Sequence, residues 1–141
     1  MFENFYYRFY FYFHFHFHLK HIPALLAAST MTFGGMWPLF DARGAMLEFG
    51  FPRRIADARA AAPAFKVGNA RTTVIGLLMF ISYSQNQLEV VDAIMAVTGA
   101  YCGLVDSYVV WREGNPQQAA FRLASSAFIS ACGCGGWTAN R

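Results

Sequence analysis

Charged residues are scarce in this chain. Asp, Glu, Lys and Arg make up 13% of its 141 residues, about half of their share in ordinary globular proteins, whereas apolar residues make up 56%. The net charge of +3 is too small to indicate a nucleic-acid partner. Cysteine is rare too. An odd count of three, all within apolar stretches, excludes a disulfide framework and predicts small packing residues instead.

Recognisable catalytic chemistry is missing as well. The sequence contains no Ser-His-Asp set, no pair of catalytic carboxylates and no metal-ligand spacing that would indicate a specific reaction. We therefore expect no metal and no cofactor. Whether the protein is an enzyme stays open at this point.

The first 20 residues form a low-complexity segment in which 11 residues are Phe or Tyr, and in which His14, His16 and His18 alternate with Phe. A His-rich tract can bind metal, but these histidines have no Cys or acidic partner nearby. An aromatic segment at the membrane surface is the favoured interpretation, because aromatic rings settle at the level of the lipid headgroups. We separate residues 1–20 from a domain of residues 21–141.

Long apolar stretches are what the chain has in abundance. They cover Ile22–Phe40, Thr72–Ser84, Val90–Trp111 and Phe121–Trp137. A helix that crosses a bilayer needs roughly 20 mostly apolar residues, and the second stretch approaches that length only if it begins at Val67. The predicted fold is therefore all-α, a bundle of four transmembrane helices. A small membrane barrel is excluded because the stretches do not alternate between apolar and polar residues.

The longest loop, residues 41–66, contains the apolar piece Ala45–Phe51, which predicts a short helix lying in the membrane interface. Positive charge gathers on the side of this loop, at Arg43, Arg53, Arg54, Arg59, Lys66, Arg71, Arg112 and Arg122, against Arg8, Lys20 and Arg141 on the other side. By the positive-inside rule, the loop 41–66 faces the cytoplasm and both termini face the lumen or the exterior. The expected location is the endoplasmic reticulum or another endomembrane, with the lipid bilayer as the main partner.

The third stretch carries a row of residues that share one helix face: Asp92, Ala96, Gly99, Gly103 and Asp106. Gly99 and Gly103 form a GxxxG, which lets another helix approach closely. The fourth stretch has a similar row that begins at Arg122 and passes through Ser126. Packing between helices is therefore expected along Gly99 and Gly103.

Arg71, Asp106 and Arg122 are expected near the same membrane face. A lone charge within a span costs a few kcal/mol, so we predict that Asp106 pairs with Arg71 or Arg122. Asp92 lies at the opposite face and is expected at the interface. The predicted cluster has two interpretations: an ion pair that fixes the helix register, or a polar site that binds or protonates a substrate entering from the bilayer.

These residues also carry a resemblance. From Gly35 to about Trp137 the chain resembles a family of small fungal integral membrane proteins grouped only as a domain of unknown function. The matching features are FGFP at Phe49–Pro52, Arg71, Gly76, Asp106 and the polar start of the fourth span. In the family pattern an acid usually follows the arginine and a histidine often stands early in the fourth span, where this chain has Thr72 and Arg122. These two departures weaken any catalytic role that the resemblance would carry over.

The resemblance implies a place in filamentous fungi, in some cases beside genes for secondary metabolites. Two functions are therefore expected. The first is an accessory protein or small enzyme that handles an apolar intermediate of secondary metabolism, with Asp106, Arg71 and Arg122 at the polar end of its site. The alternative is a structural or interaction protein of the endomembrane without chemistry, in which Gly99 and Gly103 mediate contact with a second copy or a partner.

Overall fold

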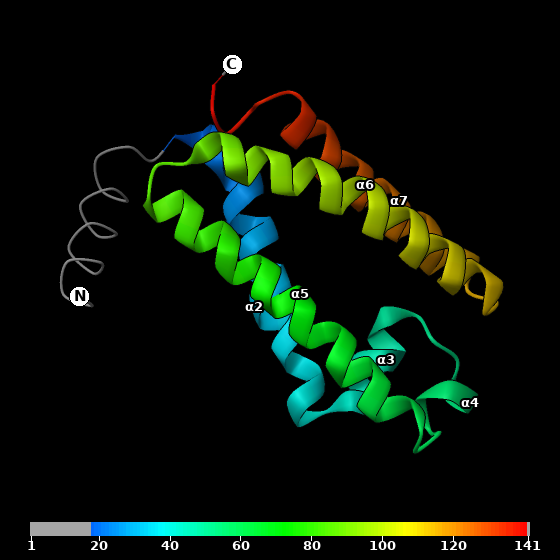
Figure 1. The fold of residues 1–141 in the computed structure, drawn as a ribbon. Coiled ribbons are helices and arrows are strands. Elements are labelled where there is room, and N and C mark those ends of the chain that lie inside the picture. Colours follow the sequence, from blue (N-terminus) through cyan, green and yellow to red (C-terminus); the bar gives the residue numbers. More distant parts are fainter. Residues whose placement is uncertain (1–17, 141) are drawn as a thin grey trace.

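The computed structural model describes residues 18–140, and all regular structure within them is helical (Figure 1). The elements are a 3-10 turn η1 (Leu19–His21) and the helices α2 (Ile22–Phe40), α3 (Ala42–Phe49), α4 (Arg53–Ala56), α5 (Ala61–Ser84), α6 (Leu88–Arg112) and α7 (Pro116–Cys134). The predicted all-α class is confirmed. His14, His16 and most of the predicted N-terminal segment lie outside the described residues.

The predicted short helix in the first loop is present as α3, and local chemistry sets both of its ends. The side chain of Asp41 accepts a hydrogen bond from the backbone N–H of Gly44, which satisfies one of the unpaired donors of the first turn. Gly50 ends the helix in the left-handed conformation, with φ of 109°, which glycine adopts without steric cost.

Two helices begin earlier than the apolar stretches predicted. α5 begins at Ala61, because Pro63 stands in its first turn, where the N–H that proline lacks has no partner within the helix anyway. α7 begins at Pro116, directly after Asn115, whose side chain accepts a hydrogen bond from the N–H of Gln118. Both prolines therefore stand in the first turn of a helix.

Within residues 18–140, α5 and α6 are long and apolar enough to cross a membrane. The helices α2 and α7 have 19 residues each and are not among these candidate spans; α2 contains paired glycines and Pro38, and α7 opens on Pro116 and two glutamines. The structure thus supports two of the four predicted spans.

The long helices form two antiparallel pairs rather than one closed bundle (Figure 1). The first pair is α2 with α5, and the second pair is α6 with α7. Within the first pair, glycines allow the two helix backbones to approach closely. A Cβ on Gly35 would lie 2.9 Å from the carbonyl oxygen of Asn69, and a Cβ on Gly76 would lie 2.7 Å from the backbone nitrogen of Thr32. The two pairs meet at one end and diverge toward the end that carries α3 and α4 (Figure 1).

The main buried core lies where the two pairs meet. It consists of Ala24, Ala27, Ala28, Met79, Tyr83, Val91, Met95 and Cys132. Polar groups close this end. The ring nitrogen Nδ1 of His21 and the hydroxyl of Tyr83 are 2.7 Å apart in a buried hydrogen bond. The expectation that every cysteine packs inside is wrong for two of them, because Cys102 and Cys134 are exposed.

Asp92, which is predicted at the membrane interface, contacts the C-terminal segment of the chain. Its side chain is buried, with 4% of the residue exposed, and its carboxylate accepts hydrogen bonds from the backbone N–H groups of Thr138 (3.1 Å) and Ala139 (2.8 Å). The chain folds back after α7 and places these donors over α6. These two backbone N–H groups lie after the end of α7 and have no acceptor within a helix. The Asp92 carboxylate accepts from both and thereby holds the C-terminal segment against α6.

Asp92→Asn should loosen the C-terminal segment. An amide has one acceptor oxygen, and its NH₂ group would face one of the two backbone donors, so about 1–3 kcal/mol of local stability is lost. Hydrogen exchange of the C-terminal peptide checks this, with faster exchange at Thr138 and Ala139 as the expected result. Asp57→Asn, which alters an exposed ion pair with Arg43, is the matched control and should change little. Unchanged protection in Asp92→Asn would contradict the assignment.

Candidate functional site

The seam between α6 and α7 brings the predicted row of small residues against the same chain. A Cβ on Gly99 would lie 2.7 Å from both the carbonyl oxygen of Ser126 and the backbone nitrogen of Ser130, and a Cβ on Gly103 would overlap the side chain of Ser126. The hydroxyl of Ser130 donates a 2.9 Å hydrogen bond to the carbonyl of Ala96. Because α7 fills this seam, Gly99 and Gly103 are not available to a second copy, in contrast to the partner contact expected from the sequence.

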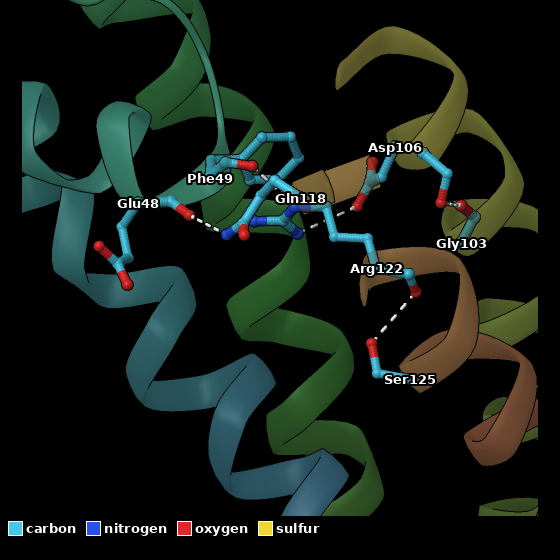
Figure 2. A network of polar contacts seen from close by, with 8 residues as sticks. Glu48, Phe49, Gly103, Asp106, Gln118, Arg122 and Ser125 are labelled. Atoms are coloured by element: carbon cyan, nitrogen blue, oxygen red, sulfur yellow. Dashed lines mark hydrogen bonds and ion pairs between the residues drawn. The ribbon is translucent and has the colours of Figure 1, made fainter. Parts of the chain in front are cut away.

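At the end of this seam the structure brings Asp106 and Arg122 together (Figure 2). The guanidinium Nη1 of Arg122 lies 3.9 Å from the carboxylate Oδ2 of Asp106. This distance is short enough for an ion pair but too long for a hydrogen bond. The side chains are 24% and 38% exposed, respectively, so a molecule at the surface of the second pair can reach both.

Arg122 also fastens α3 to the second pair. Its Nε donates a 2.7 Å hydrogen bond to the carbonyl of Phe49, and its guanidinium carbon lies 3.6 Å from the centre of the Phe49 ring. One turn earlier, the side-chain amide of Gln118 donates a 2.9 Å hydrogen bond to the carbonyl of Glu48 (Figure 2). The last carbonyls of a helix have no partner within the helix, so α7 supplies the donors that α3 lacks.

Aromatic rings surround the α3 end of this contact. The Phe49 and Phe51 rings are stacked, with centroids 5.0 Å apart, and the Phe65 ring meets both of them edge-on. The face of the Phe49 ring opposes the Arg122 cation, which is a favourable electrostatic arrangement. The guanidinium is therefore fixed by a ring, a carbonyl and a carboxylate that come from two different helices.

Arg71 is not part of this cluster. It lies on α5 in the first pair and is exposed, and within residues 18–140 it forms no ion pair with Asp106 or any other acid. Of the two partners predicted for Asp106, the structure provides Arg122. A further ion pair that the sequence did not indicate joins Arg54 of α4 to Glu113 after α6, at 2.6 Å.

A groove lies between α5 and α6, near the turn that joins them. Its volume is about 690 Å³, and it is an open depression in the surface rather than an enclosed cavity. Its lining is mostly aliphatic and consists of Ile75, Leu78, Glu89, Val90, Ala93, Ile94, Val97 and Thr98. Thr98 begins a row at helical spacing that continues through Cys102 to Asp106, eight residues or about 12 Å further along α6.

Within the described part of the chain, no three His, Cys, Asp or Glu side chains are grouped so that they could hold a metal ion. Two features remain as candidates: the apolar groove between α5 and α6, and the Asp106–Arg122 pair on the face of α6 that meets α7.

Comparison with protein families places the chain. A family model described as domain of unknown function (DUF4267) matches residues 28–136. The chain belongs to the DUF4267 family. Comparison with curated proteins and with solved structures gave no match.

The DUF4267 match contains the whole path from α3 to α7, so the seam glycines, the groove, Asp106 and Arg122 all lie within the family domain. It begins at Ala28, after the buried His21, and it ends before Thr138. The expected membership in a family of unknown function is confirmed. The sequence missed Phe49 as the partner of Arg122 and Gln118 as a second donor to α3, although the spacing of Gln118 and Arg122 by four residues placed both on one face of α7.

Proposed function

We propose that this DUF4267 protein is an integral membrane protein of a fungal endomembrane that binds an apolar intermediate of secondary metabolism, as an accessory protein or a small enzyme. Its apolar body would occupy the groove between α5 and α6, and its polar end would reach Asp106 and Arg122. The observation that carries the proposal is this combination of a mostly aliphatic groove and a charged pair about 12 Å along the same helix.

A membrane location is supported by the surface of the described helices. Large apolar side chains are exposed on all four long helices, as expected of helices that contact lipid. The three tryptophans, Trp37, Trp111 and Trp137, are all exposed and stand in the last turn of α2, in the last turn of α6 and just after α7. Tryptophan at helix ends is typical of the boundary between lipid tails and headgroups.

The topology remains part of the proposal. We place α3, α4 and their arginines on the cytoplasmic side and both termini on the lumenal side, in agreement with the positive-inside rule. In this orientation α3 lies in the cytoplasmic interface, and the charged pair is reached from the cytoplasmic leaflet.

The alternative is a structural or interaction protein without chemistry. The hydrogen bond from Arg122 to the carbonyl of Phe49 favours this alternative. A residue that joins two helices in this way needs no ligand to explain its presence. The two proposals differ in what the groove does: only the first requires it to be empty and accessible.

The test is a gene deletion in the fungal host with comparative metabolite profiling, followed by rescue with variants. Asp106→Asn removes the carboxylate charge. Val97→Trp fills the groove, and Val105→Trp is the matched control, because both valines are exposed on α6 but Val97 alone lines the groove. We expect loss of a metabolite or accumulation of a precursor, restored by Val105→Trp but not by Val97→Trp or Asp106→Asn at equal protein levels. Full rescue by all three variants would leave the structural alternative, and an unchanged profile on deletion would remove the link to secondary metabolism.

A further inference from the structure

From the Arg122–Asp106 geometry we infer that the site takes an apolar molecule that carries a hydroxyl group, and that this hydroxyl sits between the two charges. The inference rests on the proposed function and names its ligand class. It follows from which hydrogen-bonding positions of the pair are occupied in the structure and which are not.

Arg122 is held in place before any ligand arrives. Its Nε–H is occupied by the carbonyl of Phe49, and its plane is fixed by the Phe49 ring. Of the five N–H donors of a guanidinium, those on the two terminal nitrogens make no hydrogen bond within residues 18–140, and Nη1 faces Asp106 across 3.9 Å. The residue therefore presents fixed donors rather than a mobile charge.

Asp106 presents the complementary acceptors. Its carboxylate accepts no hydrogen bond from the described part of the chain, and its side chain is 38% exposed. The donors of Arg122 and the acceptors of Asp106 do not reach each other, so both keep open hydrogen-bonding positions. A group placed between them gains two hydrogen bonds at once if it accepts from Arg122 and donates to Asp106.

The signs of the two charges select the group. A carboxylate or phosphate on the ligand would be attracted by Arg122 but repelled at similar range by Asp106, and an ammonium would meet the reverse. A ketone or an ether accepts but cannot donate. An alcohol or a phenol does both with one oxygen atom, and its neutral charge suits a molecule that travels in the bilayer.

The experiment uses purified full-length protein in nanodiscs of phosphatidylcholine. Four photoactivatable alkyl probes of equal chain length carry a primary alcohol, its methyl ether, a carboxylic acid or an amine, and crosslinked peptides are mapped by mass spectrometry. We expect the alcohol to label the peptides that contain Phe49 and Arg122 about tenfold more than the ether, because one charge-assisted hydrogen bond is lost in the ether. Asp106→Ala should reduce alcohol labelling to the level of the ether.

Gln118→Leu is the control for a merely structural effect. It removes a hydrogen bond from α7 to α3 without touching the charged pair, so it should keep the preference for the alcohol. Equal labelling by all four probes would show apolar partition alone and would overturn the inference, as would a preference for the acid or the amine. A sterol added to the nanodiscs separates two sources of the hydroxyl. If the sterol reduces labelling by the alcohol probe, the hydroxyl belongs to a membrane sterol. If labelling is unchanged, the hydroxyl belongs to a smaller alcohol dissolved in the membrane.

Failure here is distinguishable from failure of the proposed function. The deletion profile does not depend on probe chemistry. A lost metabolite together with unselective labelling would keep the proposed function and reject the hydroxyl.

Discussion

Gly99→Ala is expected to destabilise the protein by about 1–3 kcal/mol or more, although alanine normally favours a helix. The added methyl would lie 2.7 Å from two backbone atoms of α7, the carbonyl oxygen of Ser126 and the nitrogen of Ser130. A backbone cannot rotate away as a flexible side chain can, so the two helices must separate. The measurement is thermal or denaturant-induced unfolding of the purified protein in detergent.

Gly34→Ala is the matched control for this change. Gly34 is also in the interior of a long helix, but a Cβ there would meet no atom within 4 Å. It should raise the free energy of unfolding by up to about 1 kcal/mol, since alanine loses less backbone entropy than glycine. The adjacent Gly35, whose Cβ would lie 2.9 Å from the carbonyl oxygen of Asn69, should behave like Gly99. If Gly99→Ala were as stable as Gly34→Ala, α6 and α7 would not pack along this seam.

The sequence predicted the helices better than their arrangement. The bounds of α2 agree with its apolar stretch, and α6 extends only a residue or two beyond its own, because a long apolar stretch of this length is a local property. The periodicity of α6 likewise places Asp106 on the face that meets α7. By contrast, periodicity identifies a face but not the partner, and it could not choose between Arg71 and Arg122 for Asp106.

The contacts that the sequence missed depend on backbone groups. Asp92 is buried because the chain turns back after α7 and brings two N–H donors to its carboxylate. α3 binds to α7 through its last carbonyls, which every helix has whatever its sequence. No pattern of side chains predicts which backbone N–H and C=O groups will be partners. The interactions that position the site could therefore be found only in the three-dimensional structure.

Arg122→Met is expected to destabilise the protein by about 2–4 kcal/mol, because it removes two kinds of interaction together. The charge-assisted hydrogen bond to Phe49 is lost, and the partly buried carboxylate of Asp106 is left without its cation. Gln118→Leu provides the comparison. It removes a neutral hydrogen bond to α3 alone and should cost about 1 kcal/mol.

A second substitution separates the two losses. Asp106→Asn in the Arg122→Met background removes the uncompensated charge, so the double variant should be more stable than Arg122→Met. Asp106→Asn alone should have a small effect, because the two charges are 3.9 Å apart. Unfolding of all four proteins in the same detergent gives the coupling free energy. If the double variant were no more stable than Arg122→Met, Arg122 would stabilise the protein through α3 alone.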